Sequence, residues 1–130
     1  MKRLQGKVGI ITGAVRGIGR ATAERFCEEG ASLVIADIDR DGIENTAAEI
    51  RDIGGNVIGQ QCDVSDAASC EAVVKRTVEE FGKLIVLMNN AAYFIVRVTV
   101  EVVDIAEWRR AIDVNLTGPM LMSKYAIPAM

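Results

Sequence analysis

A glycine-rich stretch near the amino terminus has the spacing of a phosphate-binding turn. Residues 12–19 read Thr-Gly-Ala-Val-Arg-Gly-Ile-Gly. Glycines allow such a turn to be tight and to approach a ligand closely, because they carry no Cβ. A helix that begins there offers unpaired N–H groups and the positive end of its dipole to an anion. The stretch therefore predicts a pyrophosphate site with these residues: Gly13, Arg16, Gly17, Ile18 and Gly19.

An acidic residue follows at the distance that a dinucleotide site requires. Asp37 stands about 20 residues beyond the glycines, at the end of a predicted second strand. A carboxylate there accepts hydrogen bonds from both hydroxyls of an adenosine ribose and repels a 2′-phosphate, so Asp37 favours NAD. Arg16 favours NADP, because a guanidinium pairs with a 2′-phosphate. We predict NAD and treat NADP as the less favoured cofactor. The alternative interpretation of both Asp37 and Arg16 is a solvated charge on a loop without a role in cofactor binding.

Apolar periodicity places the glycine turn in an alternating βα chain. Strand-like runs cover residues 7–12, 32–36, 56–61 and 83–88, and helical spacing covers residues 18–29, 40–53, 66–81 and 104–130. The first helical stretch places Ile18, Ala21, Thr22 and Phe26 on one stripe. The fourth strand is predicted to be buried on both faces because its apolar run is unbroken. We expect one domain over residues 1–130, an α/β, Rossmann-type, doubly wound parallel sheet that is incomplete, with about four strands and flanking helices.

Composition disfavours several classes of protein. A net charge of −3 provides no basic face for nucleic acid. An apolar run such as residues 84–88 falls far short of the roughly 20 residues that cross a bilayer, so we expect no membrane partner and a cytoplasmic protein. The chain has no histidine, which removes Ser-His-Asp and Cys-His catalysis. Its three cysteines lack C-x-x-C spacing, so no metal site is predicted.

Four motifs together resemble the short-chain dehydrogenase/reductase family. They are the T-G-x-x-x-G-x-G turn, Asp63-Val64 after the third strand, the Asn-Asn-Ala-Ala of residues 89–92, and the Asp-Val-Asn-Leu-Thr-Gly of residues 113–118. The resemblance covers essentially the whole chain. It implies an NAD(P)-dependent oxidoreductase that interconverts a secondary alcohol and a ketone by hydride transfer, with a small-molecule alcohol or ketone as the substrate of the complete protein.

The resemblance also implies roles for individual residues. Asp63 and Val64 would contact the adenine ring, and Asn90 with Ala91 would lie near the nicotinamide-side ribose. Asn115 would be the catalytic asparagine, which holds a water in a proton relay. The sequence departs from the family at two places: alanine stands at residue 92 instead of glycine, and isoleucine stands at residue 85 instead of aspartate.

The tyrosine and lysine that the family uses for proton transfer do not occur in their usual pattern. Tyr93 is followed four residues later by Arg97, and Tyr125 by Ala129, so neither begins a Tyr-x-x-x-Lys pair. The family carries these residues, with a serine, downstream of the asparagine helix. We therefore expect the 130 residues to be inactive alone. The apolar ending suggests a fragment, a truncated product or the ordered part of a longer protein.

Three further expectations concern the assembly of the chain, its role and one segment. An apolar last helix beside an open sheet edge predicts a homo-oligomer, on the basis of Met120, Leu121, Met122 and Ile127. The alternatives to an enzyme part are a non-catalytic dinucleotide-binding or dimerisation module and, less favoured, a frame-disrupted product without function. The segment 93–103 either lines one wall of the substrate site or is a connecting loop.

Overall fold

The computed structural model describes residues 2–130 and contains a four-stranded parallel sheet of order β3-β2-β1-β4. The strands are β1 (Val8–Thr12), β2 (Ser32–Asp37), β3 (Asn56–Gln61) and β4 (Val86–Met88). The helices are α1 (Gly17–Glu28), α2 (Arg40–Asp52), α3 (Ala67–Phe81), α4 (Ile105–Ile112) and α5 (Gly118–Ala129). A π-helical turn, η1 (Asp113–Thr117), joins α4 to α5. The predicted incomplete Rossmann-type parallel sheet is confirmed.

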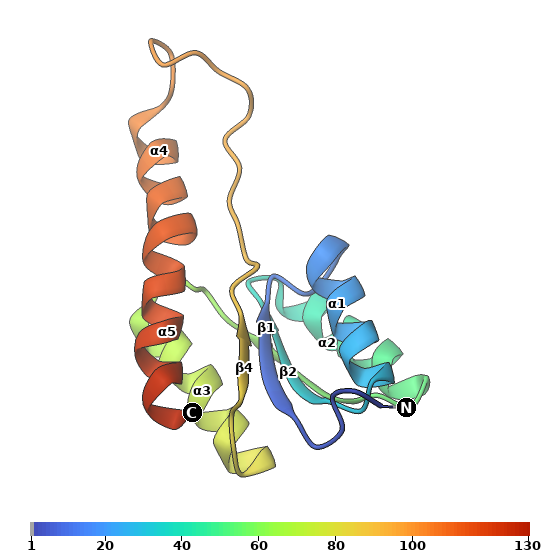
Figure 1. The fold of residues 1–130 in the computed structure, drawn as a ribbon. Coiled ribbons are helices and arrows are strands. Elements are labelled where there is room, and N and C mark those ends of the chain that lie inside the picture. Colours follow the sequence, from blue (N-terminus) through green and yellow to red (C-terminus); the bar gives the residue numbers. More distant parts are fainter. Residues whose placement is uncertain (1) are drawn as a thin grey trace.

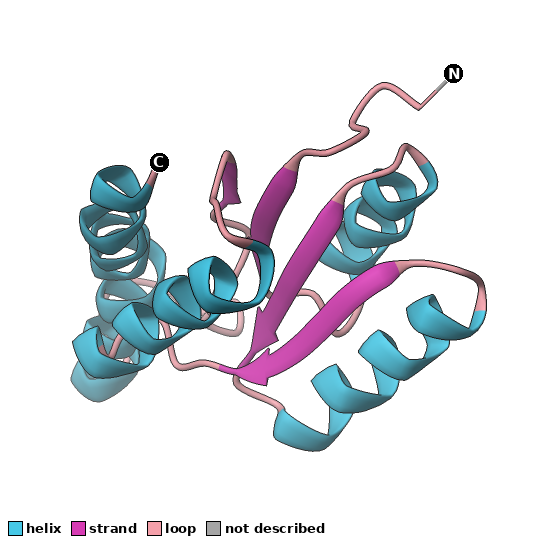
Figure 2. Cartoon of the chain, turned by 90° about the horizontal axis from the view of Figure 1, so that it is seen from below, coloured by secondary structure: helices cyan, strands magenta, loops and turns pink. Residues whose placement is uncertain are grey.

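Helices cover both faces of the sheet (Figures 1 and 2). Neighbouring residues of a strand point to opposite faces, so each strand contributes to two cores. Ile10 and Val34 pack with residues of α3 and α5, such as Val73 and Met122. Ile11, Leu33 and Ile35 pack with residues of α1 and α2, among them Ala23, Ile43 and Ala47. The strands therefore meet solvent only at their ends and at the two edges of the sheet.

Two predicted elements differ from the structure. The fourth strand is regular only over Val86–Met88, which is half-buried rather than buried on both faces, and Ile85 is 42% exposed. The reason is position, because β4 pairs only with β1 and forms an edge of this sheet. The expected helix over 104–130 is present as one helical run over residues 105–129, but it contains the π-helical turn η1. Along residues 2–130, none of the helices combines the length and apolar character that a membrane crossing requires.

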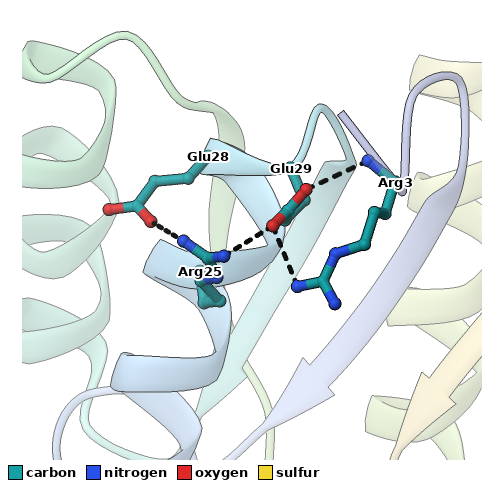
Figure 3. Close-up of polar contacts among 4 residues, drawn as sticks. All are labelled: Arg3, Arg25, Glu28 and Glu29. Carbon is teal, nitrogen blue, oxygen red and sulfur yellow. Dashed lines mark hydrogen bonds and ion pairs between the residues drawn. The ribbon is translucent and has the colours of Figure 1, made fainter. Parts of the chain in front are cut away.

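The start of the chain is tied to the end of α1 by charge-assisted hydrogen bonds (Figure 3). The Glu29 carboxylate accepts from the Arg3 backbone N–H at 3.0 Å and from its guanidinium at 2.9 Å, and Arg25 donates to it at 2.6 Å. The hydrogen bonds from Arg3, with the positive charge of Arg25 beside them, lower the pKa of Glu29 to about 2. These contacts fix the approach of the chain to β1 and thereby to the glycine turn.

Candidate functional site

A cleft of about 610 Å³ opens at the carboxyl ends of all four strands. Its lining residues come from the segments that follow each strand: Gly13 to Ile18 after β1, Asp37 to Asp39 after β2, Cys62 to Val64 after β3, and Asn90 to Phe94 after β4, together with Arg110 and Val114. The sheet order reverses at β1, which lies between β2 and β4. Open α/β sheets bind ligands at such a reversal, outside the carboxyl ends of their strands.

The three glycines of the turn have different surroundings. A Cβ on Gly13, whose φ is +67°, would lie 2.7 Å from the Cα of Ala91. A Cβ on Gly19 would lie 2.4 Å from the carbonyl oxygen of Gly13 and 2.6 Å from Nδ2 of Asn90. Gly17 also has a positive φ, +62°, but its Cβ would meet only open space. Gly13 and Gly19 thus permit close packing of the chain, whereas Gly17 leaves the cleft side of the turn open.

The amino terminus of α1 lacks the cap that other helices carry. Asp39, Asp66 and Asp104 accept hydrogen bonds from the first turns of α2, α3 and α4. In α1 the capping position is held by Arg16, which makes no such bond, and the first turn contains no acidic residue. First-turn N–H groups have no acceptor inside their own helix. The cleft therefore receives uncapped N–H donors and the positive end of the α1 dipole, which suits an anionic ligand.

Asp37 is held at the end of β2 by the backbone around it. Its carboxylate accepts hydrogen bonds from the N–H of Val15 at 3.2 Å and from that of Asp39 at 3.1 Å. A carboxylate has about four acceptor positions, so these two bonds orient Asp37 without saturating it. Arg16 lines the same cleft and forms no ion pair within residues 2–130. The acidic and basic residues predicted to choose between cofactors thus lie in one cleft.

The turn after β3 is closed by its own side chains. The Asp63 carboxylate accepts from the backbone N–H of Ser65 at 3.0 Å and from its hydroxyl at 2.6 Å. Val64 is buried, and its carbonyl oxygen accepts from the Cys70 thiol at 3.3 Å. A hydrogen bond to Cys62, together with burial, raises the pKa of the Cys70 thiol. Asp63 therefore shapes this part of the cleft wall, and its contact with an adenine ring stays a prediction.

A hydrogen-bonded junction joins the ends of β1 and β4. The Thr12 hydroxyl accepts from the backbone N–H groups of Asn90 at 3.1 Å and of Ala91 at 3.0 Å. The Asn90 side chain donates from Nδ2 to the carbonyl oxygen of Gly13 at 3.0 Å. Asn90 consequently braces the glycine turn from the end of the neighbouring strand β4.

Asn115 lies on η1, outside the residues that line the cleft, and clamps one that does. Its Oδ1 accepts from the backbone N–H of Tyr93, and its Nδ2 donates to the carbonyl oxygen of Tyr93, both at 2.8 Å. The Tyr93 hydroxyl donates to the Glu107 carboxylate, and the Arg110 guanidinium lies 5.0 Å from the ring centroid. The hydrogen bond to Glu107 raises the pKa of Tyr93.

The structure brings nine of the predicted site residues to the cleft and leaves two beside it. Those lining it are Gly13, Arg16, Gly17, Ile18, Asp37, Asp63, Val64, Asn90 and Ala91. Gly19 is buried behind the turn and Asn115 acts through Tyr93. Sequence reasoning assigned no site role to Arg110 or Val114, which stand four residues apart on α4 and η1; the motif of residues 113–118 placed this segment at the site but did not indicate which of its side chains line the cleft. Within residues 2–130, no three potential ligand side chains gather as a metal site.

Comparison with known proteins decides the family. The family described as short chain dehydrogenase matches residues 7–130. The chain belongs to the short-chain dehydrogenase family. The resemblance carried by the glycine turn and the three later motifs is therefore confirmed.

Relatives and a solved structure agree with this assignment. Galactitol 2-dehydrogenase of Agrobacterium fabrum is 43% identical over 122 residues, which are 94% of this chain and 46% of that protein. Cis-4-hydroxycyclohexanecarboxylate dehydrogenase of Sinomonas cyclohexanicum is 39% identical over 124 residues, 95% of this chain and 49% of that protein. The crystal structure of a short chain dehydrogenase/reductase from Burkholderia phymatum in complex with NAD aligns with a TM-score of 0.91 at 34% identity, covering all of this chain and 46% of the other. The chain spans about half the length of the curated relatives it matches.

Proposed function

We propose that this chain is the cofactor-binding part of an NAD(P)-dependent oxidoreductase that interconverts a secondary alcohol and a ketone. The observation that carries the proposal is the convergence of the uncapped α1 terminus, Gly17 and Asp37 on one cleft. The similar Burkholderia phymatum structure contains NAD. The two named relatives are dehydrogenases of compounds that bear hydroxyl groups. A small-molecule alcohol or ketone is the corresponding substrate class.

Each part of a nicotinamide dinucleotide has a fitting surface in the cleft. The open side of Gly17 and the first-turn N–H groups of α1 would hold the pyrophosphate, where a side chain at residue 17 would obstruct it. Asp37 would accept from the adenosine ribose hydroxyls, and Asp63 with Val64 would border the adenine. Asn90 and Ala91 would lie at the nicotinamide end. When bound, the nicotinamide supplies or accepts the hydride.

The residues of this chain orient the cofactor and the cleft wall, and they supply no group for proton transfer. Tyr93 and Phe94 line the cleft beyond Asn90, and Asn115 fixes the Tyr93 backbone through two hydrogen bonds. The 130 residues contain no Tyr-x-x-x-Lys pair to move the proton that accompanies hydride transfer. We therefore propose that these residues bind the dinucleotide and do not turn over substrate alone. The three cysteines are free thiols, and we propose the reducing cytoplasm as the compartment.

Asp37 is proposed to make NAD the preferred dinucleotide. Its carboxylate is oriented into the cleft by Val15 and Asp39, where a 2′-phosphate would meet a like charge. Arg16 lines the same cleft, is exposed, and has no ion-pair partner within residues 2–130 to orient its guanidinium. The oriented carboxylate of Asp37 therefore contributes more to the choice between NAD and NADP than the guanidinium of Arg16.

Fluorescence titration with NADH and NADPH tests cofactor binding and preference together. Wild type is expected to bind NADH more tightly, and D37S is expected to lower the NADH-over-NADPH ratio on the order of tenfold, since removal of one close charge contact changes binding by about this factor. D41N is the matched control, because Asp41 lies on α2 outside the cleft lining. Failure to bind either dinucleotide, or a ratio that D37S leaves unchanged, contradicts the proposal.

A non-catalytic dinucleotide-binding module is the second candidate, favoured by the missing Tyr-x-x-x-Lys pair. A turnover assay with a panel of secondary alcohols and NAD separates the two roles. The 130 residues are expected to bind without turnover. A longer chain that contains these residues and turns over an alcohol supports the oxidoreductase, and one that binds NADH without turnover supports the module. Turnover by the 130 residues alone contradicts the proposal that they bind the dinucleotide without catalysing the reaction.

A further inference from the structure

Thr46 is a buried helix residue whose hydroxyl is bonded outside its own helix. Threonines inside helices commonly return their hydroxyl to the carbonyl oxygen one turn earlier. Thr22 of α1 and Thr77 of α3 do this, each donating to the carbonyl oxygen four residues earlier. Thr46 of α2 is 2% exposed and instead donates to the carbonyl oxygen of Val15 at 3.1 Å. The side chain of Thr46 therefore joins α2 to the glycine turn, 31 residues earlier in the chain.

A second feature of α2 fits the same residue of the turn. Gly42 lies four residues before Thr46, so the two residues share one face of α2. A Cβ on Gly42 would lie 3.0 Å from Cγ1 of Val15 and would also meet the carboxylate of Asp39. A larger residue at position 42 would thus require α2 or the turn to shift. Gly42 and Thr46 together bring this face of α2 into close contact with Val15.

Val15 links Thr46 to the acidic residue of the cleft. Its carbonyl oxygen accepts from Thr46, and its N–H donates to Oδ2 of Asp37 at 3.2 Å. The other carboxylate oxygen of Asp37 accepts from the N–H of Asp39. Val15 and Asp37 both line the cleft, whereas Thr46 lies behind them on α2. A shift of the Val15 backbone would therefore change the direction from which the Asp37 carboxylate is held.

The bond from Thr46 to Val15 is not needed to satisfy the hydroxyl of Thr46. The carbonyl oxygen of Gly42 lies one turn earlier in α2 and is the local acceptor of the kind that Thr22 and Thr77 use. The choice of Val15 as the acceptor instead fixes a residue of the turn. Because the site is buried, water replaces such a bond poorly when the hydroxyl is removed.

We propose that Thr46 is a positioning residue that, through Val15, holds the Asp37 carboxylate in the orientation that favours NAD over NADP. This role rests on the proposed function, because it requires Asp37 to meet the adenosine ribose. Hydrogen bonds to the two ribose hydroxyls depend on the direction of the carboxylate. A loosened carboxylate loses that alignment and is also able to turn away from a 2′-phosphate. Both changes lower the preference for NAD.

Titration of T46V with NADH and NADPH tests the proposal. Valine has nearly the shape of threonine and lacks the hydroxyl. The NADH-over-NADPH affinity ratio is expected to fall about threefold, less than in D37S, because one hydrogen bond is lost and the carboxylate remains. T46S keeps the hydroxyl and is expected to keep the wild-type ratio. In a D37S background, T46V is expected to leave the ratio unchanged, because the carboxylate that Thr46 positions is absent.

T77V is the matched control for T46V. Thr77 is fully buried on α3, and its hydroxyl is bonded within that helix. T77V therefore removes a buried hydroxyl, as T46V does, without releasing the glycine turn. Partial unfolding of either variant lowers both affinities by the same factor and cancels in the ratio. T77V is expected to keep the wild-type ratio even where urea denaturation shows a loss of stability.

Hydrogen exchange without nucleotide gives a second measurement. The amide of Ile10, which is buried in β1, reports opening of the sheet. Relative to Ile10, the amide of Val15 is expected to exchange several-fold faster in T46V than in wild type. T46S and T77V are expected to show the wild-type relative rate, because both keep the bond from residue 46 to Val15.

The outcomes distinguish this role from the proposed function. A wild type that binds neither dinucleotide overturns the proposed function, and the role of Thr46 with it. A wild type that prefers NADH, together with a T46V variant whose ratio or relative Val15 exchange is unchanged, overturns the role of Thr46 alone. So does a T77V variant whose ratio falls as far as that of T46V, because the effect would then follow from the loss of any buried hydroxyl.

Discussion

The two walls of the cleft are built by different physical means. The wall after β1 consists of backbone, glycines and a helix terminus, and its shape depends on what cannot fit: a Cβ on Gly19 would overlap Gly13 and Asn90. The wall after β4 consists of side chains held by hydrogen bonds, chiefly those of Asn115 to the Tyr93 backbone. Steric exclusion fixes the shape of the wall after β1, here called the first wall. Polar contacts at exposed positions fix the shape of the wall after β4, the second wall.

This difference sets the order of mutational effects. Steric overlap in a packed junction cannot be relieved by solvent, and typically costs about 1–3 kcal/mol or more. A hydrogen bond at an exposed site is partly replaced by water, and its net contribution is about 0.5–1.5 kcal/mol. Substitutions on the glycine wall should therefore damage folding and binding together, whereas those on the Tyr93 wall should loosen the site locally.

G19A is expected to have the largest effect. The added methyl group would lie 2.4 Å from a backbone oxygen and 2.6 Å from an amide nitrogen that is already hydrogen-bonded to Gly13. We expect the free energy of unfolding to fall by roughly 3 kcal/mol. NADH binding should be lost because α1 can no longer sit against the junction. Urea denaturation and NADH fluorescence measure the two effects.

G54A is the matched control for G19A. Gly54 has a φ of +95° and open space around its Cβ position, so alanine there meets backbone strain without overlap. We expect a loss of about 1–2 kcal/mol from the left-handed conformation and unchanged NADH binding. If G19A loses no more stability than G54A and still binds NADH, sterics do not set the first wall.

N115A tests the second wall and should have a smaller effect. It removes both hydrogen bonds to Tyr93, and we expect a loss of roughly 1–2 kcal/mol because the site is exposed. The amide of Tyr93 should exchange with solvent faster, while NADH affinity changes by less than tenfold. N115D keeps the oxygen that accepts from the Tyr93 N–H and loses the N–H that donates to the Tyr93 carbonyl. Its stability should therefore fall between those of wild type and N115A. Unchanged exchange at Tyr93 in N115A would show that the clamp is not what holds this wall.

The elements up to Phe81 could be predicted because their ends carry local signals. Gly30 and Gly82 adopt the positive φ that ends a helix, and Asp66 caps the helix it precedes. The buried face of α1 was predicted less well. The periodicity grouped Ile18 with Ala21, Thr22 and Phe26 on one stripe, yet Ile18 is 74% exposed at the cleft and the buried residues are Gly19 and Ala23. Close approach to the sheet selected the small side chains, which hydrophobic periodicity does not reveal.

The site divides in the same way. Residues at or just beyond the end of a strand, such as Asp37 and Asp63, were predictable because parallel strands bring their carboxyl ends together. Arg110 was not, because its position depends on the path of the long connection after β4 and on the phase of the helix. The π-helical turn at Asp113–Thr117 changes that phase, and it has no sequence signal of its own.

The smallest expected effect concerns the ionisation of Tyr93. Its hydroxyl donates to the Glu107 carboxylate, which stabilises the neutral phenol and repels the phenolate, so the pKa of Tyr93 is raised from 10.0. Arg110 opposes this shift, because its positive charge favours the phenolate. In a Y125F background, absorbance of tyrosinate should report Tyr93 alone. E107Q should bring its pKa back toward 10.0, and R110Q should raise it further.

The sign of the accompanying stability change follows from the raised pKa. The neutral phenol is favoured in the folded chain, so the contribution of the Tyr93–Glu107 contact is fully present below pH 10 and is lost as the pH rises through the raised pKa. Y93F removes this dependence and should flatten the alkaline limb of a stability profile measured by urea denaturation. N115A leaves the hydroxyl in place, so a flattened limb in N115A would show that the backbone clamp and the Glu107 contact act as one unit. If the loss of stability at alkaline pH is unchanged in Y93F, the Tyr93–Glu107 contact does not stabilise the wall after β4. Asn115 would then be the main support of that wall.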